Sequence, residues 1–326
     1  MKPLVSIIIP IYQVSGYVER CIRSVMNQTY TEIECLIVDD ATTDDSIEKC
    51  ERLIDDYHGS IRFKILHHET NRGLSAARNT GTDEAKGDYL YYLDSDDEIT
   101  PNCIETLVSF VINDTSIEMV QGNHIKVSNN EEEIAKSKTS KVSDNDMARK
   151  MLYHCHDIHV SVWNKLLKRT FVIQNKLYCR EGVICEDTLW MFYLLKFLQK
   201  AFLCEDVTYY YHIRPNSIST GSGKKRMGES CIVLYNDILY NLTDGKEKVE
   251  LRGLMYGFCR RYVSCKNDVP QLTGTIDLYK ERSLQYGCWY VYFVLTMVKV
   301  TCFVCDPLPI LNMLNTARWR MKRLFL

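Results

Sequence analysis

The sequence lacks the features by which secreted and nucleic-acid-binding proteins are usually recognised. The apolar run at residues 4–11 is short and Pro10 interrupts it, so we expect no signal peptide. The 326 residues carry a formal net charge of −2, and no overall excess of basic residues indicates a nucleic-acid partner. No internal repeat is present. We therefore expect a globular protein that does not bind nucleic acid.

The fourteen cysteines are scattered along the chain rather than grouped. Several of them, such as Cys21, Cys50 and Cys103, lie within apolar runs, where a thiol acts as a small core side chain. This distribution favours reduced thiols in the cytosol over a disulfide framework. It also argues against a structural zinc site, which needs grouped ligands.

The length and composition favour one large domain or a catalytic domain with an appendage. Hydrophobic residues make up 46% of the chain, which is enough for a sizeable core. Apolar runs of strand length alternate with segments of helical spacing in the first part of the chain. Strands are expected at residues 5–9, 33–38, 62–68 and 88–93, and helices at 16–28 (capped by Ser15), 45–57, 75–85 and 100–112.

This alternation predicts an α/β fold with a mainly parallel sheet flanked by helices. Residues 128–146 are polar and are expected to form a loop or weak hairpin. A helix is expected at 185–198 and a strand at 201–213. The pattern after about Gly221 is mainly helical, which predicts a helical C-terminal region.

Three polar clusters directly follow predicted strands. They are residues 10–12 (PIY), 39–40 (DD) and 94–97 (DSDD). Ligands of open parallel sheets bind beyond the carboxyl ends of the strands, so the three clusters should converge on one ligand site.

The D-x-D pair at Asp94 and Asp96 would place two carboxylates close together in a partly dry pocket. A divalent cation offsets such repulsion, and hard oxygen ligands suit Mg²⁺ or Mn²⁺. Such a cation would in turn bind the diphosphate of a substrate. The alternative is an exposed acidic turn that caps the next helix.

Seven motifs, taken in order, resemble family 2 glycosyltransferases with the GT-A fold, of the bacterial type that builds surface polysaccharides. The N-terminal motifs are VSIIIPIYQ, LIVDDATTDDS, NRGLSAARNTG and GDYLYYLDSDDEITP. The later ones are VWNKLLKRTF, ICEDTLW and YYYHIRPNSIS. The resemblance covers about residues 3–220. It implies a nucleotide-sugar-binding catalytic domain at 1–220 and a helical C-terminal region at 221–326.

The resemblance implies roles for the residues that follow the first two strands. Pro10 and Tyr12 would line the nucleotide pocket, with the ring of Tyr12 beside the base. Asp40 would accept a hydrogen bond from the base, and Asp39 is a second candidate for the nucleoside. Helix capping is the alternative for Asp40. The family usually has asparagine where this chain has Gln13.

Further donor-binding residues are implied by the next two motifs. Gly73 and Ala76 are small, which permits close approach of the backbone to a ligand. Arg78 would hold either a phosphate or Asp94. Asp94 would lie near the ribose and the metal, Ser95 would belong to the donor site, and Asp96 would be the main metal ligand.

The catalytic residues implied by the resemblance are Asp187 and Glu186. Asp187 would be the base that deprotonates the acceptor hydroxyl, and Glu186 would act beside it or bind acceptor hydroxyls. The alternative is that both acids only complement the dipole of the following helix. Lys165 would hold the diphosphate or orient Asp187, and His212 is a weaker candidate for a metal ligand.

Trp163 and Arg214 also lie in the later motifs. The indole of Trp163 would stack on a sugar face or belong to the core, and the sequence leaves both open. Arg214 would neutralise phosphate.

The activity implied is inverting transfer of a sugar from a nucleotide-diphosphate sugar, with UDP-sugars as the first expectation, to a saccharide or lipid-linked saccharide. The cofactor would be Mn²⁺ or Mg²⁺, and the location cytoplasmic, at the inner face of the cell membrane. A sugar nucleotidyltransferase is one alternative, but PIYQVSGYVERC lacks the glycine-rich basic loop expected after its first strand. The other alternative, an inactive nucleotide-sugar-binding module, should have lost D-x-D or the later base.

The end of the chain suits contact with a membrane surface. Residues 283–298 contain no charged residue, but Lys299 interrupts the run before it reaches the roughly 20 residues of a spanning helix. Residues 318–326 (RWRMKRLFL) mix basic and apolar side chains, as peripheral anchors do. A helical subdomain packed on the sheet is the alternative.

Overall fold

The computed structural model describes residues 2–128, 131–135, 139–214, 223–242 and 247–304. The chain divides into two compact units. The first contains Met1–Asn145, Val160–Gly182 and Tyr193–Arg214, and the second contains Asp146–His159, Val183–Phe192 and Pro215–Leu326. The domain boundary predicted between residues 220 and 221 lies outside the described residues.

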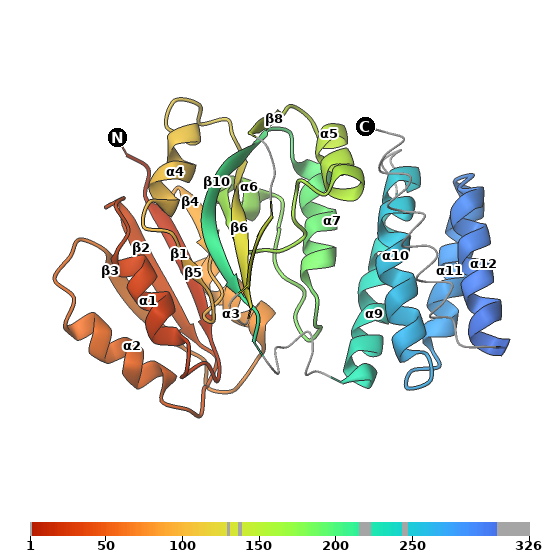
Figure 1. The fold of residues 1–326 in the computed structure, drawn as a ribbon, viewed down its shortest axis with the longest axis horizontal. Helices are drawn as coiled ribbons and strands as arrows, with labels where there is room; N and C mark the ends of the chain where they lie inside the picture. The colour runs from red at the N-terminus through yellow and green to blue at the C-terminus, as the bar shows by residue number, and fades with distance from the viewer. Residues whose placement is uncertain (1, 129–130, 136–138, 215–222, 243–246, 305–326) are drawn as a thin grey trace. The chain divides into compact units, whose positions relative to one another are not determined.

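The first unit is built on one mixed sheet flanked by helices (Figure 1). The main strand order is β3-β2-β1-β4-β9-β6-β10-β5, with β7 paired to β6 and β8 paired to β10. The strands are β1 (Val5–Ile11), β2 (Ile33–Asp39), β3 (Arg62–His67), β4 (Tyr89–Tyr92), β5 (Glu98–Ile99), β6 (Met119–Ser128), β7 (Glu131–Ala135), β8 (Ser140–Val142), β9 (Lys165–Lys168) and β10 (Ala201–His212). The helices are α1 (Val18–Met26), α2 (Ser46–Asp55), α3 (Leu74–Glu84), α4 (Cys103–Val111) and α6 (Arg169–Gln174), while α7 (Asp187–Phe197) has residues in both units.

Most of the central pairings are parallel, as the alternation of strands and helices predicts. Strand β1 pairs in parallel with β2 and β4, β2 with β3, and β6 with β10. Strand β9 lies antiparallel between β4 and β6. The carboxyl ends of β1, β2 and β4 therefore lie at one edge of the sheet. Strands β1 and β2 are longer than predicted and include Pro10, Ile11 and Asp39, so the three clusters lie at or directly after the strand ends.

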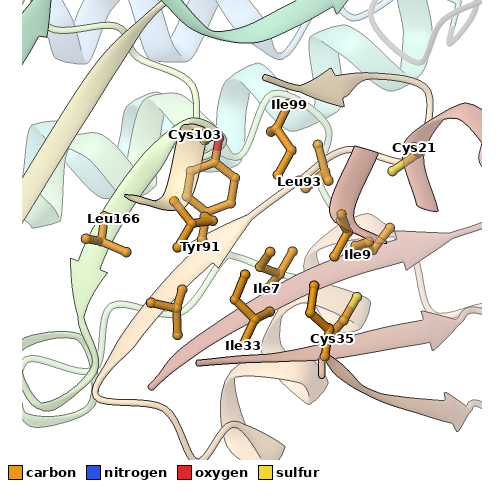
Figure 2. Packing of buried hydrophobic residues seen from close by; sticks show 14 of the residues in the cluster. Ile7, Ile9, Cys21, Ile33, Cys35, Tyr91, Leu93, Ile99, Cys103 and Leu166 are labelled. Carbon is orange, nitrogen blue, oxygen red and sulfur yellow. Dashed lines mark hydrogen bonds between the residues drawn. The ribbon is translucent and has the colours of Figure 1, made fainter. Parts of the chain in front are cut away.

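Strand β1 is buried on both faces, which explains why all of its residues except Ser6 are apolar. Its odd-numbered residues, including Ile7 and Ile9, join a core with residues from β2, α1 and α4, part of which is drawn in Figure 2. Cys21 and Cys103 are buried in the same core, as their apolar surroundings in the sequence indicate.

Helix α3 lies against β1 and β2 at very close range because it carries a glycine at the contact. A Cβ atom added to Gly81 would lie 2.4 Å from Cγ2 of Ile8. The NRGLSAARNTG segment therefore brings its helix down onto the strands that end at the site.

Strand β6 is the longest strand that the sequence pattern does not predict. Its buried residues include Gln121, Asn123 and His124, which break the apolar alternation of a strand. The Asn123 side chain donates to the carbonyl of Glu205 at 2.9 Å. Such partners are distant in the sequence, so the residues around Asn123 do not indicate that its side chain can be buried.

Two local predictions differ from the structure. Ser15 does not cap the first helix: α1 begins at Val18, and the Ser15 hydroxyl accepts from Lys49 at 2.8 Å and donates to Asp45. That hydroxyl instead ties the segment after β1 to α2. The polar stretch expected as a loop or weak hairpin contains two described strands, β7 and β8, paired with different neighbours.

The second unit is mainly helical, in agreement with the sequence pattern. It contains most of α5 (Asn145–Lys150), the π-helical turn η1 (Met151–Cys155), α9 (Lys224–Tyr240), α10 (Glu247–Cys265), α11 (Leu272–Gln285) and α12 (Trp289–Val304). Within this unit the fully buried Arg149 and Glu250 form an ion pair at 2.9 Å. Among the described residues, we find no helix with the length and apolar character needed to cross a membrane.

Candidate active site

The residues after β1, β2 and β4 are brought together by the strand register. The backbone N–H of Asp40 donates to the carbonyl of Ile11 at 2.9 Å, and that of Leu93 donates to the carbonyl of Ile8 at 3.0 Å. Tyr12, which follows β1, is exposed, whereas Pro10 is buried within the strand.

Asp40 is buried and fully engaged with the segment that follows β3. One of its carboxylate oxygens accepts from His68 Nδ1 at 2.7 Å and from the N–H of Arg72 at 2.8 Å. The other accepts from the N–H of Gly73 at 2.7 Å. Gly73 has a φ of 91°, a conformation that favours glycine. Asp40 therefore shapes the glycine turn that precedes α3.

Asp39 is the more accessible of the two acids. Its side chain is 13% exposed, against 3% for Asp40. It accepts from the N–H of Thr42 at 2.8 Å and lies 2.9 Å from His67 Nδ1. Both oxygens of each acid have hydrogen-bond partners within the protein, so Asp39 differs from Asp40 in its greater exposure.

Arg78 pairs with Asp94, the first carboxylate of residues 94–97, which we call the acidic turn. The guanidinium is buried and donates from Nη2 to Asp94 at 2.6 Å. Ala76, on the same helix, is fully buried, as is nearly all of Ser95. The sequence left a phosphate and Asp94 open as partners of Arg78, and the structure contains the contact with Asp94.

Asp96 pairs with a second arginine, Arg214, which donates from Nε at 2.5 Å. The guanidinium of Arg214 also lies over the ring of Tyr17, 5.1 Å from its centroid. Arg20 donates to the backbone carbonyl of Asp96 at 2.6 Å. Burial, followed by the nearby charge of Asp94, raises the pKa of the Asp96 carboxyl above its ordinary value.

Asp97 anchors the turn to β10. It is buried and accepts from the hydroxyl of Tyr209 at 2.6 Å and from the N–H of His212 at 2.8 Å. The Tyr209 hydroxyl also accepts from the N–H of Asp94 at 3.4 Å. Burial, with the neighbouring charges of Asp96 and Asp94, raises the pKa of Asp97 well above its ordinary value. The His212 ring lies 2.8 Å from Glu98, so its Nε2 faces that carboxylate.

Two residues of the W-N-K motif are packed within the first unit. Lys165 is fully buried in β9 and donates to the carbonyl of Ser161 at 2.6 Å. Trp163 stacks on Tyr209 with ring centroids 4.5 Å apart and meets the edge of His124 at 5.0 Å. These contacts favour the core interpretation of Trp163.

Glu186 and Asp187 belong to the second unit. Asp187 is the first residue of α7, and the carbonyl of Glu186 accepts from the N–H groups of Leu189 and Trp190. Glu186 is nearly fully buried. Their catalytic roles stay predictions.

The acidic turn has donors that suit a divalent cation, although the described residues contain no group of three or more His, Cys, Asp or Glu side chains placed to hold a metal. Asp94 and Asp96 supply hard carboxylate oxygens, and Mg²⁺ and Mn²⁺ commonly take only one or two of these from the protein. Both carboxylates lie in the turn at residues 94–97, and each is only about one-fifth exposed. The residues present therefore fit the cofactor predicted from the sequence.

Several residues of this site escape sequence reasoning. Arg20 supports the backbone of the acidic turn from α1, His68 supports Asp40 from beyond β3, and Tyr209 supports both Asp94 and Asp97 from β10. The one usable signal was the position of His68 at the end of a predicted strand, beside the edge where the polar clusters meet.

Comparison with known proteins agrees with this geometry. The model of the family "Glycosyl transferase family 2" matches residues 6–174, which include the β1, β2 and β4 clusters. Glycosyltransferase GlyA of Streptococcus pneumoniae serotype 4 is 31% identical over 225 residues, which are 66% of this chain and 31% of GlyA. The matched regions amount to 31–47% of the length of GlyA and two other bacterial glycosyltransferases.

Solved structures share the fold at low sequence identity. The crystal structure of Staphylococcus aureus TarS residues 1–349 superposes with a TM-score of 0.69 at 17% identity, covering 92% of this chain and 88% of that one. TarS has also been solved with UDP-GlcNAc. The mannosyltransferase PcManGT of Pyrobaculum calidifontis, solved with GDP-Man and Mn²⁺, has a TM-score of 0.57 at 14% identity, covering 93% and 88%. The predicted GT-A fold is confirmed.

Proposed function

Because the chain belongs to glycosyl transferase family 2, we propose that it is an inverting glycosyltransferase using a nucleotide-diphosphate sugar, with a UDP-sugar as the first expectation. The acceptor is a saccharide or lipid-linked saccharide in the synthesis of a surface polysaccharide. The observation that carries the proposal is that Asp39, Asp94 and Asp96 all come from the same carboxyl edge of neighbouring parallel strands. The binding of UDP-GlcNAc by the similarly folded TarS supports the choice of nucleotide.

The donor would lie along this edge. Tyr12 and Asp39 bind the nucleoside, and the glycine turn at Gly73 lets the backbone approach the diphosphate. Arg78 orients Asp94 beside the ribose. Asp40 acts indirectly, by holding the N–H groups of Arg72 and Gly73.

Asp94 and Asp96 would hold Mn²⁺ or Mg²⁺, and PcManGT, a neighbour in fold, was solved with Mn²⁺. A bound divalent cation stabilises the negative charge that develops on a leaving diphosphate. The protein contributes a fixed carboxylate geometry, since Arg78, Tyr209 and Arg20 each hold part of the turn.

Asp187 would take the proton of the acceptor hydroxyl as that oxygen attacks the anomeric carbon. One base and one leaving group on opposite sides of the carbon give single displacement with inversion. Glu186 would help to bind the acceptor. We place the reaction in the cytoplasm, which agrees with free cysteines buried in the core, such as Cys35 and Cys204.

The decisive experiment measures products from a panel of nucleotide sugars with Mn²⁺ present. Release of free nucleoside diphosphate is expected. Release of pyrophosphate from a nucleoside triphosphate would instead identify a nucleotidyltransferase, and binding without turnover would identify an inactive module.

Two variants test the assigned roles. Asp96→Ala should abolish metal-dependent turnover while the thermal unfolding of the protein stays near that of the wild type, and wild-type rates would refute its assignment. Asp187→Asn should bind the donor normally in calorimetry and lose transfer. Loss of donor binding in this variant would move Asp187 to a structural role.

A further inference from the structure

Helix α12 exposes a continuous apolar face in the second unit. The side chains of Trp289, Phe293, Met297 and Val300 recur at intervals of three and four residues and are 61%, 61%, 56% and 55% exposed. This spacing places them on one side of the helix. Tyr290 is exposed beside them, and its hydroxyl lies 3.2 Å from that of Tyr256.

The opposite face of α12 is also apolar and is already used. Val291, Leu295 and Val298 are fully buried against the helices of this unit. A helix that is apolar on both faces needs an apolar environment on each. The described part of the helix is 16 residues long, or about 24 Å, which is short for a bilayer crossing. We therefore look for a partner that covers the exposed face of α12 and leaves its buried face packed against the protein.

The charges around this face point to the nature of that partner. Lys299 is the one charged residue in the sequence of α12, and it pairs with Asp277 at 2.5 Å. The 20 residues from position 307 to the end of the sequence contain four basic side chains and no acid, in a chain whose net charge is −2. The basic residues are Arg318, Arg320, Lys322 and Arg323.

We propose that the outer face of α12 lies flat on an anionic membrane surface, assisted by the basic residues that follow it in the sequence. The apolar side chains enter the boundary between headgroups and acyl chains, and the basic residues meet anionic headgroups. Trp289 and Tyr290 are the residue types that favour this boundary. The proposal goes beyond glycosyl transfer and does not depend on it.

A second copy of the chain fits this face less well. A second copy carries the same basic residues after α12 in its sequence, so it offers them no complementary charge. A membrane with anionic lipids instead supplies the opposite charge.

The test is flotation of the full chain with vesicles of phosphatidylcholine, with and without phosphatidylglycerol. We expect the wild type to float with the anionic vesicles and to be released by high salt. The double variant W289S/F293S should lower the partition constant at least about tenfold. The matched control V233S/Y240S, which also removes two exposed apolar side chains but from α9, should float like the wild type.

A third variant separates charge from apolar contact. R318Q/R320Q/K322Q/R323Q should bind anionic and neutral vesicles alike. Failure of the wild type to float, or equal flotation of W289S/F293S, would overturn the proposal. A wild-type dimer in light scattering that W289S/F293S converts to a monomer would also overturn it, by assigning this face to a second copy.

Discussion

Arg214 donates its Nε hydrogen to the carboxylate of Asp96 at 2.5 Å, from a position 118 residues further along the chain. Together with the contact between Arg78 and Asp94, this gives each acid of the D-x-D pair its own arginine. The guanidinium of Arg214 thus lies where a metal bound to Asp96 would compete with it.

The first prediction concerns this competition. Arg214→Ala should strengthen Mn²⁺ binding in the absence of nucleotide by roughly fivefold, because a positive charge beside the ligand is removed. Arg214→Lys keeps the charge and is the control. Titration calorimetry measures the affinity, and unchanged or weaker Mn²⁺ binding by Arg214→Ala would contradict the prediction.

The second prediction concerns acid stability. Burial, with the charges of Lys126 and Lys165, lowers the pKa of His124 from its usual 6.5 to about 4. The unfolded chain therefore binds a proton at this residue before the folded one does, and stability falls as the pH drops from 6.5 towards 4. The loss amounts to about 3 kcal/mol at most.

His124→Phe keeps an aromatic edge against Trp163 and cannot titrate. Its free energy of unfolding, measured in denaturant, should fall less than that of the wild type across this pH range. Parallel pH curves for the two proteins would show that His124 does not titrate as described.

The third prediction separates the two acids after β2. The side chain of Asp40 is surrounded by three hydrogen-bond donors. Asp40→Asn replaces one accepting oxygen with an NH₂ group, which is itself a donor, and should lower the free energy of unfolding by about 2–3 kcal/mol. Asp39→Asn should cost less than about 1 kcal/mol, because its side chain is more exposed.

Nucleotide affinity should follow the accessible acid. Asp39→Asn should weaken UDP binding at least about tenfold if its carboxylate meets the nucleoside. Denaturant unfolding and UDP titration of both variants check these expectations. A stable Asp40→Asn protein with weakened UDP binding would instead assign base recognition to Asp40.

The fourth prediction concerns the strand that leads to the acidic turn. A Cβ atom at Gly87 would lie 2.7 Å from the backbone nitrogen of Ser6 and 2.9 Å from the carbonyl oxygen of Leu4. Backbone atoms cannot move aside cheaply, so Gly87→Ala should lower stability by about 2–3 kcal/mol. A Cβ atom at Gly16 would meet nothing within 4 Å, so Gly16→Ala should be neutral or slightly stabilising. Thermal unfolding of both variants and the wild type measures these effects.

The central part of the fold was predictable from the sequence for a simple reason. Strands β1 and β2 are buried along nearly their whole length, so most of their residues are apolar, and a local pattern records this. Strand β6 was not predictable, because its buried Asn123 is satisfied by the carbonyl of Glu205, 82 residues away. Burial of a polar group depends on a partner that the local pattern does not contain.

The candidate active site was likewise only partly predictable from the sequence. The sequence by itself determined which acids lie at the strand ends, since parallel strands must end at a common edge, and it therefore indicated Asp39, Asp40, Asp94 and Asp96. Only the tertiary structure decided their partners: Arg214 for Asp96, Tyr209 for Asp97 and His68 for Asp40. The physical reason is that backbone pattern and burial are local properties, whereas hydrogen bonds between side chains far apart in sequence arise only when the sheet has formed.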